Sequence, residues 1–199
     1  MSLVNYERKG RTAYITLNRP EAFNAVNITV ARELTQAWID VRDDPEVWTA
    51  IVTGTGDRAF SAGYDLKEVN ELRTQAEKEN RPMVLPVLDM IWPMRGLEVW
   101  KPFIAAINAQ DAYRLGLVNK VVPKAELMSA AEAMANRINE NGPLAVRAAK
   151  EAAYRGARVP LDEGLRMETI FFLKAAMSED AAEGPRAFSE KRKPVYKGR

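Results

Sequence analysis

The chain has 199 residues, of which 47% are hydrophobic and 28% charged, and its formal net charge is +2. These values are typical of a globular protein with one sizeable core, and they argue against a protein that binds nucleic acid through its charge. The chain contains no cysteine and no histidine, which excludes disulfides and a thiol nucleophile and removes the commonest general base and most zinc sites.

The first half of the chain predicts an α/β unit. Residues 3–8 and 12–17 have the pattern of two strands joined by a hairpin turn. Asn27 is a suitable N-cap for a helix that runs to Asp43, because apolar residues recur there at helical spacing. Residues 49–53 form a short buried strand, and the order strand, strand, helix, strand is that of a wound α/β fold.

The stretch 59–66 (AFSAGYDL), which follows this strand and a turn at 54–57, is the most informative feature of the chain. Ala62 and Gly63 are small enough to let the backbone run close to a ligand. A helical pattern begins at Tyr64 or Asp65, so unpaired N–H groups point outward where the helix dipole is positive. Such a turn can hold a carbonyl oxygen that gains negative charge, which predicts oxyanion or enolate stabilisation on an acyl substrate.

The second half of the chain predicts mostly helices. The expected elements are a helix at 66–81, a broken helix at 83–99, a strand at 103–107, a short helix at 109–116, an extended segment at 117–122, and helices at 127–141, 143–155, 161–177 and after Ser178. We therefore expect an α/β core over residues 1–123 and a helical region over 124–199. The helix at 161–177 is too apolar on its surface to stay isolated, so it should face other helices or a neighbouring subunit.

Several segments, in this order, resemble the crotonase, or enoyl-CoA hydratase/isomerase, superfamily. They are residues 17–25 (LNRPEAFNA), 60–66, 101–108 (KPFIAAIN), 109–119 (AQDAYRLGLVN) and the tail from 183 to 197. The resemblance implies a crotonase-like ββα spiral core followed by a C-terminal helical oligomerisation region. It also implies self-association as trimers or pairs of trimers.

The resemblance further implies a site for an acyl-CoA or enoyl-CoA substrate. The backbone N–H of Tyr64 matches the position that donates to the thioester oxygen. The CoA moiety, which belongs to the substrate and is no separate cofactor, would be contacted at Ala22, Phe23, Ala62, Asp65, Leu66, Phe172 and Lys191. Three ordinary alternatives stay open: a plain strand-to-helix turn at Tyr64, a core position for Phe172, and a solvated tail at residues 191–193.

The sequence departs from the family pattern after Asn108. In the family, a glycine-rich turn and several dozen residues follow the Ile-Asn pair, whereas here Asn108 runs directly into Ala109. The missing stretch normally supplies the second oxyanion N–H and the catalytic glutamates. The remaining candidates, Asp65, Glu68, Asp89 and Glu98, show no spacing typical of an acid/base pair, so the sequence nominates none of them.

Two classes of function remain. The first is an enzyme of the enoyl-CoA hydratase type, with isomerisation, dehydration or decarboxylation as other reactions of the same oxyanion site. The second is a catalytically inactive CoA-binding or assembly protein that has lost its middle. We favour the enzyme, with the stretch present in the protein, because its loss would uncover strand and pocket surface. The chain shows no signal peptide or membrane-length apolar run, so we expect a cytosolic protein that does not bind membranes.

Overall fold

A four-stranded mixed sheet forms the centre of the protein, and the computed structural model describes residues 2–82, 97–106, 113 and 118–199. Strands β1 (Val4–Lys9) and β2 (Thr12–Leu17) form an antiparallel hairpin. Strand β3 (Thr49–Gly54) pairs in parallel with β2, and β4 (Phe103–Ala105) pairs in parallel with β3. The predicted hairpin and strands are confirmed; the broken helix at 83–99 and the helix at 109–116 fall mostly outside the described residues.

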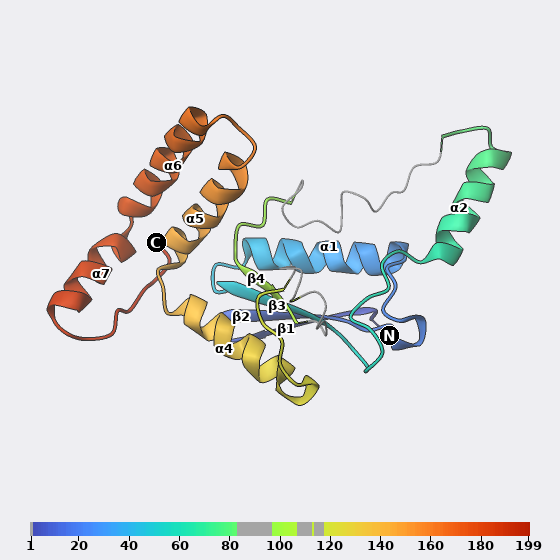
Figure 1. The fold of residues 1–199 in the computed structure, drawn as a ribbon, viewed down its shortest axis with the longest axis horizontal. Helices are drawn as coiled ribbons and strands as arrows, with labels where there is room; N and C mark the ends of the chain where they lie inside the picture. Colours follow the sequence, from blue (N-terminus) through green and yellow to red (C-terminus); the bar gives the residue numbers. More distant parts are fainter. Residues whose placement is uncertain (1, 83–96, 107–112, 114–117) are drawn as a thin grey trace.

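Helices cover both faces of this sheet, as Figure 1 shows. Helix α1 (Ile28–Asp43) begins where predicted, since the Asn27 side chain accepts a hydrogen bond of 2.8 Å from the Val30 N–H. It packs on the face that carries the buried side chains of Ala13, Ile15, Leu17, Ala50 and Val52. Because successive strand residues point to opposite faces, Ile51 packs instead against α4 (Leu127–Asn139) on the other side.

The remaining helices extend from this core. They are α2 (Leu66–Lys78), α5 (Pro143–Gly156), α6 (Leu161–Ala176) and α7 (Glu179–Ser189), with short 3-10 turns at Pro20–Ala22 and Lys124–Glu126. Helices α5 and α6 pack as a hairpin whose close approach uses two glycines, because a Cβ on Gly164 would lie 3.5 Å from the Gly156 Cα. In the part of the chain that the structure describes, no helix is long and apolar enough to cross a membrane.

The expected architecture, an α/β core followed by C-terminal helices, is therefore confirmed. The division into units of residues 1–123 and 124–199 stays a prediction. Helix α4, which lies beyond that boundary, packs on β3 and β4, and α5 to α7 extend away from the sheet in Figure 1.

Two lysines that donate to backbone carbonyls tie α5, the segment before β4 and the end of α1 together. The Lys150 ammonium donates to the Lys101 carbonyl at 2.9 Å and lies 4.2 Å from the centre of the Phe103 ring. The Lys101 ammonium donates to the Asp44 carbonyl at 2.5 Å. Burial lowers the pKa of each lysine to about 8, and the nearby Arg147 guanidinium also lowers the pKa of Lys101.

These lysines make the stability of the fold depend on pH. Between pH 8 and 10.5 the unfolded chain binds more protons at Lys101 and Lys150 than the folded chain does, so stability rises with pH in this window. We expect the urea midpoint, followed by tryptophan fluorescence, to rise between pH 7 and pH 9.5. Lys150→Met should reduce that rise, whereas Lys67→Met, at an exposed position of α2, should leave it unchanged. An equal rise in all three proteins would contradict the assignment.

Candidate active site

The turn after β3 presents backbone N–H groups that the fold leaves unused, among them that of Tyr64. This Tyr64 turn (residues 61–65) is held by a parallel bridge to Val26, in which Val26 N–H donates to the Gly63 carbonyl at 2.7 Å. Three of the neighbouring amides are satisfied: Ala62 N–H donates to the Phe23 carbonyl, Gly63 N–H to the Ser61 hydroxyl, and Asp65 N–H to the Val26 carbonyl, whereas Ser61 N–H has no acceptor among the described residues. Within the described residues the Tyr64 N–H has no acceptor.

Open space lies beside this amide. Gly63 has a φ of +82°, and a Cβ built on it would meet no atom within 4 Å. Glycine is therefore required there by its backbone conformation, since side-chain packing imposes no limit. Ala62 and Gly63 are exposed, while the Tyr64 ring packs against the core and anchors the turn. A ligand can approach the unpaired amide from the exposed side.

Asn24 organises the loops around the Tyr64 turn. Its side chain is 1% exposed, its amide donates to the carbonyls of Thr55 and Ala59 at 2.9 Å each, and its oxygen accepts from the Arg19 N–H. Its backbone carbonyl accepts from the Ser61 hydroxyl at 2.8 Å. Asn24 has a φ of +54°, which asparagine tolerates better than most residues. Sequence reasoning did not single it out, although an asparagine just after the 20–22 turn was a usable signal.

Asp65 is committed to the fold. Its carboxylate caps α2 by accepting from the N–H groups of Lys67 and Glu68, and it forms a 2.6 Å ion pair with Arg19. The Arg19 guanidinium and these backbone N–H groups lower the pKa of Asp65. The expected helix-start role of Asp65 is thus confirmed. Glu68 is also engaged, because its carboxylate accepts from the Ile28 N–H at 2.8 Å. Neither carboxylate is free to act as a base at Tyr64.

Six of the predicted site residues come together in this loop cluster: Ala22, Phe23, Ala62, Tyr64, Asp65 and Leu66. Four of these residues donate their N–H groups within the fold, namely Ala22, Phe23, Ala62 and Asp65. Their backbone carbonyl oxygens are the groups that could accept hydrogen bonds from CoA. Phe23 is 39% exposed, and the Arg58 guanidinium lies 3.8 Å from its ring centre. Their contacts with CoA stay predictions.

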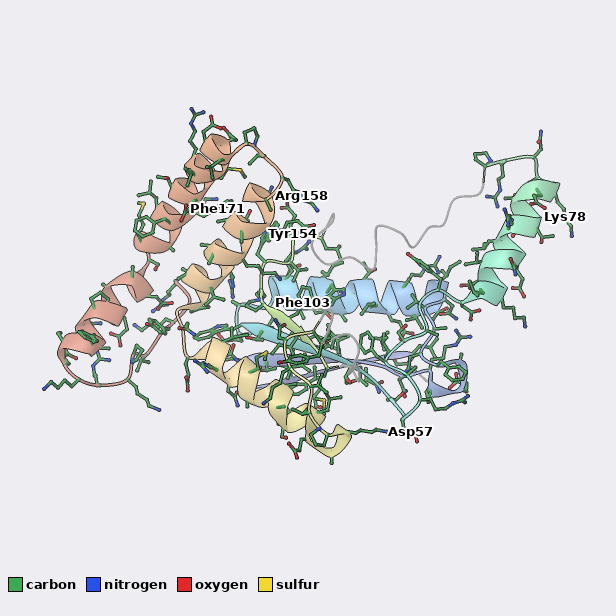
Figure 2. All side chains as sticks on the ribbon, viewed as in Figure 1. Asp57, Lys78, Phe103, Tyr154, Arg158 and Phe171 are labelled. Carbon is green, nitrogen blue, oxygen red and sulfur yellow. The ribbon has the colours of Figure 1, made fainter. Side chains whose placement is uncertain are left out.

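The other two predicted residues, Phe172 and Lys191, lie elsewhere. Phe172 is 66% exposed and lines a groove of about 500 Å³ between α5 and α6. Lys191 is exposed in the turn after α7. Figure 1 places α6 and α7 on the opposite side of the molecule from α2, and Figure 2 shows the same separation between Phe171 and Lys78. Within one chain, these two residues cannot complete the site at Tyr64.

The arrangement can polarise a carbonyl oxygen but offers no complete proton-transfer machinery. A single amide donor at the start of a helix stabilises a developing negative charge, and oxyanion sites commonly use two donors. Beside the Tyr64 turn, the described residues provide no free carboxylate pair. A site with two oxyanion donors and an acid/base pair would need groups beyond those described beside this turn.

Comparisons with known proteins give one consistent result. The model of the family described as Enoyl-CoA hydratase/isomerase matches residues 7–108 and 98–199. Carnitinyl-CoA dehydratase of Salmonella typhi is 33% identical over 254 residues, which cover 96% of this chain and 97% of that protein. A crystal structure of an enoyl-CoA hydratase/isomerase from Mycobacterium paratuberculosis is 31% identical, has a TM-score of 0.84 and covers 99% of both chains. Enoyl-CoA hydratase from Bacillus anthracis, at 26% identity and a TM-score of 0.86, covers 99% of this chain and 100% of its own.

The same comparisons place the missing stretch. The Salmonella typhi alignment spans 254 residues and this chain has 199, so at least 55 aligned positions have no counterpart here. The family model matches in two segments, the first of which ends at residue 108. These findings agree with the predicted gap after Asn108.

Proposed function

Because this chain belongs to the enoyl-CoA hydratase/isomerase, or crotonase, family, we propose that it adds water to, or removes water from, a CoA thioester bound at the Tyr64 turn. The family is one of CoA-thioester enzymes, and the fold is the mixed α/β fold of its members. The observation that carries the proposal is the Tyr64 N–H, which has no acceptor among the described residues and lies at the start of α2 beside open space. A dehydratase and a hydratase among the relatives support the water chemistry, since the two reactions are the reverse of each other.

The proposed mechanism uses the Tyr64 amide as an electrostatic stabiliser. The thioester carbonyl of a 2-enoyl-CoA accepts the Tyr64 N–H. As the oxygen of a water molecule bonds to C3, the electron pair of the C2–C3 double bond moves to form an enolate, whose oxygen carries the negative charge. The water proton leaves to a base, and a proton is delivered to C2. A donor placed before the reaction stabilises the enolate more than the neutral thioester, which accelerates the step.

A second candidate function is a CoA-binding protein without turnover. It is favoured by the commitment of Asp65 and Glu68 to the fold and by the stretch that this chain lacks relative to its relatives. Between β4 and α4, a groove of about 380 Å³ is lined by side chains such as Ile104, Leu127 and Met134.

One experiment separates the two candidates. The purified 199-residue protein is titrated with CoA by calorimetry and assayed with a short 2-enoyl-CoA and with carnitinyl-CoA. CoA binding with turnover of either thioester supports the enzyme. Binding without turnover selects the second candidate, and failure to bind CoA at all rejects both. The expected cytosolic location stays a prediction.

We also propose that the protein self-associates through α6, as trimers or pairs of trimers. Leu165, Ile170, Leu173 and Met177 on this helix are 53%, 54%, 52% and 87% exposed. Burial of such side chains contributes about 1.5–3 kcal/mol each, so a neighbouring copy would stabilise the assembly. Self-association would also bring Phe172 and Lys191 of one copy toward the Tyr64 turn of another, which the single chain does not do.

Leu173→Glu should dissociate this assembly. A carboxylate on the apolar face of α6 would lose hydration in the interface without gaining a partner, so we expect the mass in sedimentation equilibrium to fall toward the monomer value of 22.3 kDa. Leu66→Glu, at a 73% exposed leucine on α2, is the matched control and should keep the oligomer. An unchanged assembly in Leu173→Glu would rule out this face as the interface.

A further inference from the structure

The tail after α7 folds back along that helix and is held by two buried acidic residues. Asp180 and Glu183, both in α7, are each 7% exposed. Asp180 accepts hydrogen bonds from the N–H groups of Lys197 at 2.7 Å and Gly198 at 2.8 Å. Glu183 accepts from the Val195 N–H at 2.8 Å. The tail is therefore bound to α7 by carboxylate–backbone hydrogen bonds at two points.

Glu183 also engages the two arginines nearest to it. The Arg192 guanidinium forms a bidentate ion pair with Glu183, in which Nη1 lies 2.6 Å from Oε1 and Nη2 lies 3.0 Å from Oε2. Arg186 donates to Oε2 at 2.9 Å, and the remaining Arg192 nitrogen, Nε, donates to Glu190 at 2.5 Å. These hydrogen bonds lower the pKa of Glu183, and the bonds from Arg192 have the largest effect. Four of the five Arg192 N–H groups are thus engaged, since Nη1 also donates to the Lys193 carbonyl at 3.1 Å.

Lys191 differs from these arginines. It forms no ion pair within the described residues, and its side chain is exposed. Its backbone has a φ of +52° and closes α7: Lys191 N–H donates to the Phe188 carbonyl and Arg192 N–H to the Ala187 carbonyl. Glycine is the usual residue at this position of a helix end, because other residues adopt the left-handed conformation at a cost. A lysine at such a position, without an acidic partner among the described residues, has its charge available for an anionic ligand.

We propose that Glu183 is a positioning residue for CoA: by holding the arginines and the Val195 amide, it keeps the α7 end in the conformation that presents Lys191 to the CoA 3′-phosphate. This inference rests on the proposed function, because it assumes that the chain binds CoA and that Lys191 contacts it. Glu183 itself touches no ligand. It acts by fixing the backbone on both sides of Lys191, through its bonds to Arg192 and to the Val195 N–H.

The test compares CoA with 3′-dephospho-CoA, both titrated into the full-length protein by calorimetry. Wild type should bind CoA about tenfold more tightly than dephospho-CoA, the size of effect expected for one contact with a charged group. Glu183→Gln should remove most of this preference by weakening CoA alone. Glu190→Gln, the same change at an exposed carboxylate that contacts Arg192, should keep it. Lys191→Ala should abolish the preference, and adding Glu183→Gln to it should have no further effect.

The outcomes separate this inference from the function on which it rests. A wild type that does not distinguish the two ligands, or a Lys191→Ala variant that still does, rejects the Lys191 contact itself. If Lys191→Ala abolishes the preference but Glu183→Gln leaves or increases it, the role of Glu183 is wrong and the contact stands. Equal weakening of both ligands by Glu183→Gln shows a merely structural role and also overturns it.

A second variant covers the case in which Glu183→Gln does not fold. Val195→Pro removes one N–H that Glu183 accepts and leaves every charge in place. It should reduce the preference for CoA in the same direction and by a smaller factor. A folded Val195→Pro protein with an unchanged preference would overturn the inference.

Discussion

Tyr64→Pro is expected to lower kcat for a 2-enoyl-CoA by about 10²- to 10³-fold, the loss typical of removing one oxyanion donor. Proline has no backbone N–H, so this substitution removes the donor on which the proposed function depends. The bonds that hold the turn, from Val26 N–H to the Gly63 carbonyl and from Asp65 N–H to the Val26 carbonyl, do not involve the Tyr64 nitrogen. Steady-state kinetics with circular dichroism on the same sample provide the measurement.

The matched control is Tyr64→Ala. This variant loses the packing of the Tyr64 ring against the core, as Tyr64→Pro does, but keeps the N–H. We expect it to be less stable than wild type and to retain most of the turnover. A folded Tyr64→Pro protein with undiminished kcat, or a Tyr64→Ala protein as inactive as Tyr64→Pro, would refute the role of this amide. Should wild type bind CoA without turnover, the same pair is compared by affinity for an acyl-CoA.

Gly54→Ala is expected to reduce the free energy of unfolding by about 3 kcal/mol, the upper part of the range for overpacking. A Cβ on Gly54 would collide with the carbonyl oxygen of Phe60 and would lie 2.7 Å from Asn24 Nδ2. Both neighbours are fixed, because Asn24 is already hydrogen-bonded to Thr55 and Ala59. The collision displaces the loop that leads to the Tyr64 turn, so CoA affinity should fall as well. Urea denaturation and calorimetry measure the two effects.

Gly10→Ala is the matched control, which measures the cost of the backbone conformation without a steric collision. Gly10 has a φ of +58° in the β1–β2 turn, and a Cβ there would meet no atom within 4 Å. Alanine should therefore cost only about 1 kcal/mol, the penalty of the left-handed conformation, and should leave CoA affinity unchanged. A loss of stability in Gly54→Ala no larger than that in Gly10→Ala would show that the loop near Phe60 relaxes around the added methyl group.

Local sequence signals predicted most secondary-structure elements well. The hairpin, α1 with its Asn27 cap, and α7 with its Ser178 cap occur as expected, because capping side chains and apolar periodicity act between residues close in sequence. Helix α2 ends at Lys78, before the predicted Arg81, since Asn80 adopts a φ of +47° and closes the helix. The helix predicted at 161–177 was expected to face other helices or a neighbouring subunit; Phe171, 8% exposed, packs toward α5, and the contact with a neighbouring subunit stays a prediction.

Sequence reasoning found the Tyr64 turn but missed what holds it. Arg19 and Asn24 support the turn through bonds to residues that lie 31 to 46 positions away along the chain. Hydrophobic periodicity and short motifs cannot predict such pairs, because the folded backbone decides which distant loops come into contact. The bonds that Lys101 and Lys150 make to distant carbonyls were missed for the same reason.

The sequence by itself determined the family resemblance, the order of strands and helices, and the turn whose small residues expose an amide, since all of these depend on neighbouring residues. It also determined the gap after Asn108. Only the tertiary structure decided that Asp65 and Glu68 are committed to the fold, that the Tyr64 N–H is left without an acceptor among the described residues, and that Phe172 and Lys191 lie far from it. Whether a polar group is free or occupied depends on partners distant in sequence, and those are specified by the packing of the whole chain.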